Sequence, residues 1–154
     1  MPTISLLREK SGQGNTNETL VIDTNAFISF VTDRNLDQQR KISTIFDDAA
    51  QLKITILCPQ NVLTEFVYVL EKIYKQPKSQ IRSMITDFIA LPGVQMINTI
   101  DFEALLEFWP DKISDFGDAI IAVVCKAKKG AEVATFDQRF IRALQVVGLN
   151  AVRL

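Results

Sequence analysis

The stretch that decides the fold is residues 19–27, TLVIDTNAF. Its first four residues form a short apolar run, which is typical of a buried β-strand. The triplet DTN at residues 23–25 consists of side chains that turn the chain and cap the amino end of a helix. We therefore expect a strand that ends at Ile22, then a turn, and then a helix from Ala26 to Thr32.

The same alternation continues along the rest of the chain. Further short apolar runs predict strands at Ile54–Leu57, Val94–Ile97, Ala131–Thr135 and Leu149–Val152. Segments with helical spacing separate them, at Asp37–Ala50, Gln60–Tyr74, Ser79–Leu91, Asp101–Phe108, Phe116–Lys128 and Asp137–Leu144. Strands that alternate with helices indicate an α/β fold, with a parallel sheet and helices on both faces. Ligands bind beyond the carboxyl ends of such strands.

Two acids follow predicted strands. Asp23 comes directly after the first strand, and Asp137 follows the strand at 131–135 and opens the next helix. Each is also typical of a helix cap, so neither residue alone distinguishes a structural role from a chemical one.

Three more acids stand close to apolar helix faces. Glu65 falls within the apolar stripe predicted for helix 60–74, where an unpaired carboxylate is costly unless it lies at the exposed edge. Asp118 begins the most apolar predicted helix, and Asp115 lies three residues earlier on the same face. An acid in a first helical turn is also common because it complements the helix dipole.

The positions of Asp23, Glu65, Asp118 and Asp137 allow these four acids to converge on one crevice. Carboxylates gathered there repel one another unless a cation holds them. Mg²⁺ or Mn²⁺ suits such a set, because these hard ions prefer oxygen ligands and no soft ligand is offered. A site of this kind activates water and stabilises charge on phosphate, which is the chemistry of phosphodiester hydrolysis.

The composition excludes several other chemistries. The chain of 154 residues has no histidine, so His-based triads and His-ligated zinc are excluded. Its formal net charge is -1, so it has no strong overall field that would attract nucleic acid. Cys58 and Cys125 are far apart and form no C-x-x-C motif, and we expect two buried, reduced thiols.

Four motifs together resemble those of PIN-domain ribonucleases. They are VIDTNAF at residues 21–27, TEFVYVLE at 64–71, DFGDAIIA at 115–122 and ATFDQRF at 134–140. Each motif is weak by itself, but all four occur in the family's order between Leu20 and Leu154. The chain is most similar to the VapC-type toxins of bacterial toxin–antitoxin pairs.

The resemblance implies a three-layer fold with a parallel sheet of order 3-2-1-4-5. It implies that Asp23, Glu65, Asp118 and Asp137 hold Mg²⁺ or Mn²⁺ and cut single-stranded RNA. Asn25 and Thr135 then support the acids through hydrogen bonds, and Asp115 matches an additional acid found in part of the family.

The resemblance also implies partners and an organisation. Family members often form homodimers and are inhibited by a small antitoxin protein. Residues 1–18 are then an amino-terminal extension, and residues 19–154 form the nuclease domain. We expect a cytoplasmic protein, because residues 1–14 do not resemble a secretory signal and the longest uncharged apolar run, Ala119–Cys125, is too short to span a bilayer.

Other functions remain open at this point. A non-catalytic RNA- or protein-binding module could keep the same fold. A two-Asp phosphotransferase is disfavoured because Asn25 stands where the second Asp of such an enzyme belongs. A nucleotide-binding fold is disfavoured because this sequence has no glycine-rich phosphate loop after a strand. A receiver domain requires paired acids after the first strand and a lysine near a late strand, and this sequence has neither.

Contacts with RNA are less clearly marked in the sequence. Single-stranded RNA requires basic groups and stacking aromatic rings around the mouth of the site. The basic candidates are Arg34, Arg40, Lys41, Lys112 and Arg139. Trp109 and Phe27 are the aromatic candidates, although core packing is the better interpretation for Phe27.

Overall fold

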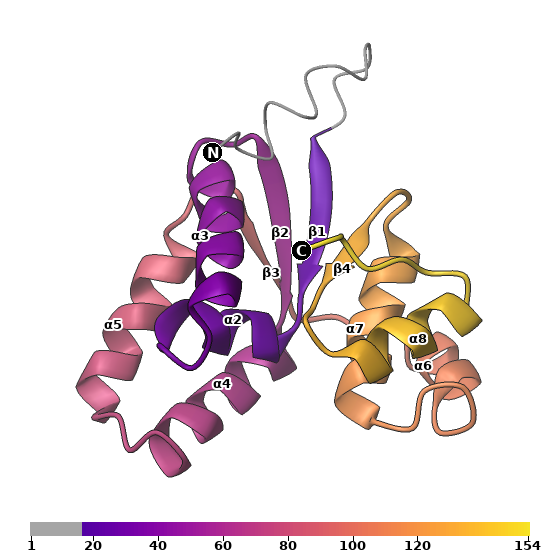
Figure 1. The fold of residues 1–154 in the computed structure, drawn as a ribbon. Coiled ribbons are helices and arrows are strands. Elements are labelled where there is room, and N and C mark those ends of the chain that lie inside the picture. Colours follow the sequence, from indigo (N-terminus) through magenta and orange to yellow (C-terminus); the bar gives the residue numbers. More distant parts are fainter. Residues whose placement is uncertain (1–16) are drawn as a thin grey trace.

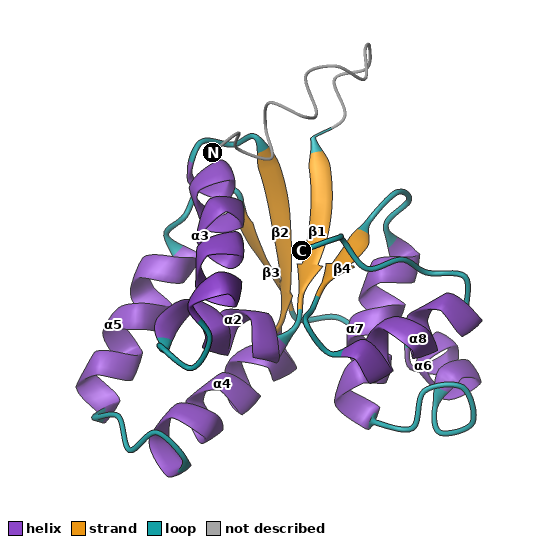
Figure 2. Cartoon of the chain, in the orientation of Figure 1, coloured by secondary structure: helices purple, strands orange, loops and turns teal. Residues whose placement is uncertain are grey.

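Figure 1 shows the computed structural model of the chain, which describes residues 17–154. Parallel strands form a central sheet, and helices cover both of its faces (Figure 2). The predicted α/β class is therefore confirmed. The expectation of a separate extension falls almost entirely on residues 1–16, which lie outside the described part of the chain.

The sheet has the strand order β3-β2-β1-β4. Its strands are β1 (Glu18–Ile22), β2 (Ile54–Pro59), β3 (Val94–Ile97) and β4 (Glu132–Ala134). This order agrees with the first four positions implied by the resemblance. The predicted fifth strand is wrong, because residues 149–152 make only one parallel bridge, between Ala151 and Val133 of the short strand β4.

The described residues form seven helices around this sheet. They are α2 (Thr24–Val31), α3 (Leu36–Ala50), α4 (Gln60–Lys72), α5 (Lys78–Ile89), α6 (Phe102–Phe108), α7 (Phe116–Ala127) and α8 (Gln138–Val146). Helices α2 to α5 lie on one side of the sheet, and α6 to α8 lie on the other (Figure 1). Within residues 17–154, no helix is long and apolar enough to cross a bilayer.

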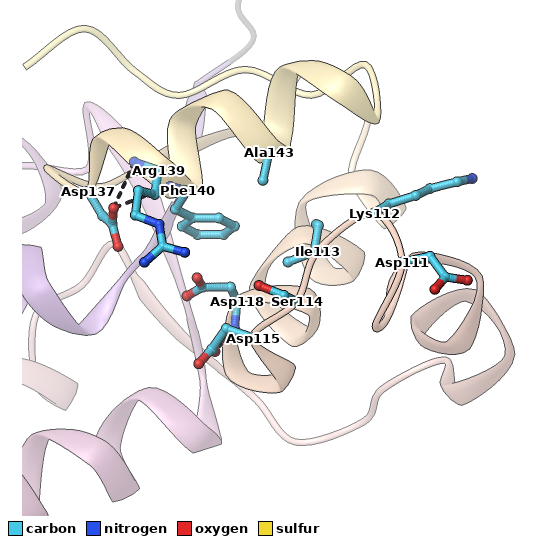
Figure 3. A pocket seen from close by; sticks show the side chains of 10 residues that line it. All are labelled: Asp111, Lys112, Ile113, Ser114, Asp115, Asp118, Asp137, Arg139, Phe140 and Ala143. Atoms are coloured by element: carbon cyan, nitrogen blue, oxygen red, sulfur yellow. Dashed lines mark hydrogen bonds between the residues drawn. The ribbon is translucent and has the colours of Figure 1, made fainter.

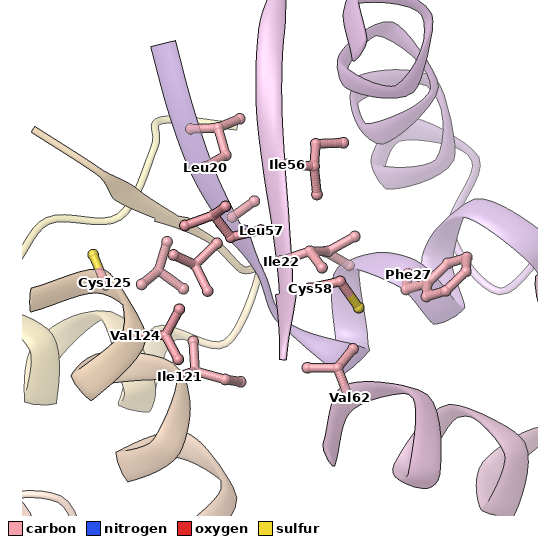
Figure 4. Close-up of a cluster of buried hydrophobic side chains, with 14 of the residues drawn as sticks. Leu20, Ile22, Phe27, Ile56, Leu57, Cys58, Val62, Ile121, Val124 and Cys125 are labelled. Atoms are coloured by element: carbon pink, nitrogen blue, oxygen red, sulfur yellow. The ribbon is translucent and has the colours of Figure 1, made fainter. Parts of the chain in front are cut away.

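The hydrophobic core fills the space between the sheet and both helical layers. Figure 4 shows side chains of β1 and β2 packed between α7 and the α2–α4 side, with Cys58 and Cys125 among them. Both cysteines are buried and unpaired, as predicted. Helix α7 is buried over much of its length, which agrees with its apolar sequence.

A close backbone approach fixes the start of β3. A Cβ atom at Gly93 would lie 2.5 Å from the Ile54 carbonyl oxygen and 2.6 Å from the Ala49 carbonyl oxygen, so only glycine fits there. The Gly93 N–H donates to the Ala49 oxygen at 2.9 Å, and the Ile56 N–H donates to the Gly93 oxygen at 2.8 Å. These bonds tie α3 to the paired strands β2 and β3.

Candidate active site

The structure brings the five acids singled out in the sequence to one cavity. Asp23, Glu65, Asp115, Asp118 and Asp137 all line a cavity of about 780 Å³. They come from the end of β1, from α4, from the first turn of α7 and from the chain after β4. The carboxyl ends of β1 and β4 are neighbours in the sheet, which explains why acids over a hundred residues apart meet.

Asp23 is the most deeply placed of these acids, with 6% of its surface exposed. Its Oδ1 accepts a hydrogen bond from the Thr24 N–H at 2.7 Å, and its Oδ2 accepts one from the Thr135 hydroxyl at 2.7 Å. Burial raises the pKa of Asp23 to about 6, although both hydrogen bonds oppose this shift. The negative charges of Glu65 and Asp137 raise it further.

The Thr135 hydroxyl is the centre of a hydrogen-bond network at the end of β4. It donates to Asp23 and accepts from the Asn25 side-chain amide at 3.1 Å and from the Asp137 N–H at 3.1 Å. The Asn25 Oδ1 in turn accepts from the Phe136 N–H at 3.1 Å. Asn25 and Thr135 thus fix the ends of β1 and β4 relative to each other.

Asp137 and Asp115 cap helices and line the cavity at the same time. The Asp137 Oδ1 accepts from the N–H groups of Arg139 at 2.9 Å and Phe140 at 3.3 Å, at the start of α8. The Asp115 Oδ1 accepts from the Asp118 N–H at 2.9 Å, at the start of α7. The structural and the chemical interpretations of these acids are therefore compatible.

The pKa of Asp118 is also raised, and more of the neighbouring acids contribute to this shift than to that of Asp23. Burial raises the pKa of Asp118 to about 7, and the charges of Asp23, Asp115, Asp137 and Glu65 add to the shift. A carboxylate with this pKa is poised between its two protonation states at neutral pH. Perturbed groups of this kind are concentrated at functional sites.

The expectation that Glu65 lies in a buried stripe is wrong. The buried stripe of α4 is Val62, Phe66 and Leu70, spaced four residues apart, and Glu65 is exposed beside it. Its Oε2 accepts a hydrogen bond from the Thr24 hydroxyl at 2.9 Å, which links α4 to the start of α2. Glu65 thus lies on the cavity wall rather than in the core.

The chemistry of the donor set fits a hard divalent cation. The cavity offers carboxylates together with the side chains of Asn25, Asn61, Thr24 and Thr64, and no thiolate lines it. As placed, no three acidic or cysteine side chains among residues 17–154 form a group that could hold a metal ion.

A second cavity of about 550 Å³ adjoins the first and shares Asp115, Asp118 and Asp137 with it. Figure 3 shows the Arg139 side chain extending from α8 towards Asp118. The Lys112 side chain lines the same cavity but points away from the acids, and its Nζ lies 5.9 Å from the centre of the Phe108 ring. Of these two predicted RNA contacts, Arg139 is therefore the one that lies closer to the acids.

The other predicted RNA contacts are placed differently. Arg34 lines a third cavity of about 400 Å³, which shares Asn25 and Asp137 with the first, while its guanidinium donates to the Asn25 carbonyl at 2.7 Å. Arg40 pairs with Asp37 on α3, and Lys41 is exposed on the same helix. No comparable site contact is found for these two among the described residues.

The aromatic candidates belong mainly to the protein's own packing. Phe27 is buried in the core, where its ring stacks on Phe66. Trp109 is partly buried, and its indole N–H donates to the Ser114 carbonyl at 3.1 Å. The ring of Trp109 also meets Phe116 edge to face. Phe27 is therefore excluded as a base-stacking group.

Sequence reasoning missed several residues of the cavity wall. Thr24 is one, although it stands between the two residues of the DTN triplet that were singled out. The others are on α4: Gln60, Asn61, Thr64 and Tyr68. For Asn61 and Tyr68 the signal was the helical spacing around Glu65, since residues three and four apart share a helix face.

Asn61 links α4 to the first turn of α7. Its Nδ2 donates to the Gly117 carbonyl at 3.4 Å. Its Oδ1 is buried and has no hydrogen-bond partner within residues 17–154. The helices that carry Glu65 and Asp118 are thus connected by a polar contact beside the acids.

The chain belongs to the PIN domain family, whose pattern matches residues 20–144. PIN domains are in general nucleases that act on nucleic acid and typically use divalent metal ions such as Mg²⁺. A comparison with curated proteins gives no match.

Proposed function

We propose that this protein is an endoribonuclease that requires Mg²⁺ or Mn²⁺ and hydrolyses phosphodiester bonds of single-stranded RNA. The observation that carries the proposal is the convergence of five carboxylates on one cavity at the carboxyl ends of β1 and β4. The raised pKa values of Asp23 and Asp118 support it, because both their burial and the charges of the neighbouring acids disfavour the ionised form, and a bound cation favours it.

In this proposal, Asp23, Glu65, Asp118 and Asp137 hold the metal ion, and Asp115 adds negative charge beside them. When bound, the ion lowers the pKa of water and stabilises negative charge on the phosphate. Thr135 and Asn25 keep Asp23 and Asp137 in register through the hydrogen bonds described above. Arg139, which extends towards Asp118, binds a phosphate oxygen of the substrate.

The arrangement of the cavities supports cleavage within a strand rather than at its end. The acid-lined cavity adjoins one cavity that contains Arg139 and another that contains Arg34, and all three share Asp137. A flexible single strand can therefore continue on both sides of the acids. The family resemblance supports RNA as the chemical class of this strand.

The test is cleavage of a mixed single-stranded RNA pool with Mg²⁺, with Mn²⁺ and with EDTA. We expect internal cuts with either ion and none with EDTA, and sequencing of the new RNA ends then identifies the target. Stable RNA in the presence of both ions would contradict the proposal.

The alternative is a non-catalytic RNA- or protein-binding module. It is favoured by one observation, namely that no three acids among the described residues form a ready metal group. RNA that is bound but not cut in millimolar Mn²⁺ would favour this alternative.

We further propose that the protein is the toxin of a VapC-type toxin–antitoxin pair, that it forms a homodimer and that a small antitoxin protein inhibits it. The resemblance of the four motifs supports this role. Expression of the parent protein should stop bacterial growth, whereas expression of the Asp23→Asn variant should not. Equal growth in both cultures would contradict the toxin role but not the ribonuclease activity.

We also propose that residues 19–154 are the nuclease domain and that the protein acts in the cytoplasm. Every proposed ligand lies after Leu20, so deletion of residues 2–16 should leave RNA cleavage unchanged. A reducing compartment suits two unpaired thiols, and burial raises the pKa of Cys58 to about 12 and that of Cys125 to about 11. Cell fractionation tests the location.

A further inference from the structure

One face of α4 forms an uncharged wall of the acid-lined cavity. Gln60, Thr64 and Tyr68 lie four residues apart along this helix, and all three are exposed and line the cavity. The Gln60 side-chain amide donates to the Thr64 hydroxyl at 2.9 Å, so the row is partly ordered by its own contacts.

The charges around this row separate two kinds of surface. Among the described residues that line the cavity of about 780 Å³, every charged side chain is acidic. Arg139 and Lys112 line only the adjoining cavity of about 550 Å³, and Arg34 lines the third. A phosphate is attracted to the basic cavities, whereas a neutral nucleobase meets no charge penalty beside the α4 row.

Tyr68 offers a suitable ring for such a base. Tyr68 is 62% exposed, whereas aromatic side chains usually bury their apolar rings. Exposed aromatic rings in single-strand binding sites stack bases without needing a particular sequence. Gln60 adds an amide, which is a group that recognises the edge of a base by hydrogen bonds.

We propose that Gln60, Thr64 and Tyr68 form a nucleobase-binding subsite next to the acids. Tyr68 stacks on the base of a nucleotide adjacent to the cleaved bond, and Gln60 contacts the edge of that base. Helix α4 thereby determines which nucleotide the protein prefers beside the cut. This inference rests on the proposed ribonuclease function.

The test compares Tyr68→Ala and Tyr68→Phe with the parent and with a matched control, Phe102→Ala. Phe102 is also 62% exposed, but it lies on α6 and does not line this cavity. Two measurements are made on each protein. One is the dissociation constant for fluorescent single-stranded RNA in Ca²⁺, an oxygen-binding cation with looser geometry than Mg²⁺. The other is the base composition at the cut ends in Mn²⁺.

Tyr68→Ala should bind RNA about tenfold more weakly than the parent. It should also lose base preference at one position beside the cut, because the base is then no longer held against Gln60. Tyr68→Phe keeps the ring and should retain both properties, and Phe102→Ala should match the parent. A Gln60→Ala variant should change the base preference more than the affinity.

The outcomes separate this inference from the proposed function. If the parent cuts RNA and Tyr68→Ala changes neither affinity nor base preference, the subsite is overturned and the ribonuclease stands. If the parent binds RNA without cutting it and Tyr68→Ala weakens binding, the subsite stands and the ribonuclease is overturned. If the parent neither binds nor cuts RNA, both are overturned.

Discussion

Helices α2 and α4 contact each other on two sides that differ in chemistry. On the core side, the rings of Phe27 and Phe66 are stacked with their centres 4.0 Å apart, and both side chains are buried. On the cavity side, one turn away, the Thr24 hydroxyl donates to Glu65, and Asp23 lies beside them. The apolar side holds the helix pair together, and the polar side holds acids whose charges oppose one another.

This difference shows how the fold can tolerate a costly site. Stacked, buried rings stabilise the helix pair at any pH and with any ion present. The acids, by contrast, gain stability from protons or cations. Changes on the two sides should therefore separate stability from activity.

The largest effect should come from removing a charge on the cavity side. Asp23→Asn and Asp137→Asn should each lower RNA cleavage roughly thousandfold, because a metal-bound acid contributes several kcal/mol to catalysis. Glu71→Gln is the control, since Glu71 pairs with Lys72 and Lys78 and does not line the acid cavity. Near-parental cleavage by Asp23→Asn would show that Asp23 is not a residue of the active site.

The next effect concerns the core side. Phe66→Ala should lower the free energy of unfolding by about 3–5 kcal/mol, because it removes a fully buried ring and leaves a cavity. Urea unfolding measures this change. Phe102→Ala, at an exposed position, should cost less than about 0.5 kcal/mol. Similar losses for the two variants would show that the ring stack does not hold the helices.

A bound ion should connect the two sides through stability. In Mg²⁺ at a hundred times its dissociation constant, the parent should gain roughly 2.7 kcal/mol. Asp118→Asn should gain much less, although in EDTA it should be at least as stable as the parent because it removes a repelling charge. Melting curves in EDTA and in millimolar Mg²⁺ test this, and equal gains would exclude Asp118 as a ligand.

The effect of pH on the free energy of unfolding should be smaller. Its direction should be opposite to the effect produced by an acid whose pKa is lowered on folding. The folded-state pKa values of Asp23 and Asp118 are raised to about 6 and about 7, so the folded protein binds more protons than the unfolded chain. In EDTA, the free energy of unfolding should therefore fall as pH rises from about 4 to about 7. Asp118→Asn should flatten this decline, whereas Glu103→Gln on α6 should not.

The smallest effect should come from the hydrogen bond between the two helices at the cavity. Thr24→Val keeps the shape of a buried side chain and removes the donor to Glu65. Stability should fall by about 1 kcal/mol, and cleavage should fall far less than in Asp23→Asn. A loss of activity equal to that of Asp23→Asn would make Thr24 part of the essential site.

The sequence predicted the fold best where local pattern and tertiary structure coincide. The run at residues 19–22 is buried on all sides, so its apolar character alone identifies β1. The predicted strand at 149–152 is wrong because these residues make a single parallel bridge to β4, between Ala151 and Val133, and no ladder. Edge pairing depends on this long-range contact, which a local window does not contain.

Part of the candidate site, like part of the fold, could be predicted from the sequence. The positions of Asp23 and Asp137 follow from the order of strands along the chain, and all five acids line one cavity. Helical periodicity placed Glu65 within the buried stripe of α4, which is wrong, because periodicity does not show how far the stripe extends or which flank of it faces the cavity. The proposed role of Tyr68 depends on its place on the cavity wall, and a single sequence does not reveal that.

The double role of Asp137 gives the molecule a spectroscopic reporter. The amide protons of Arg139 and Phe140 both point to its Oδ1, at the first turn of α8. Any change in the charge of that oxygen, whether by a proton, an ion or a substrate, should move the nuclear magnetic resonance signals of these two amides. Occupancy of the acid cavity could thus be followed by titration in the intact protein, without measuring turnover.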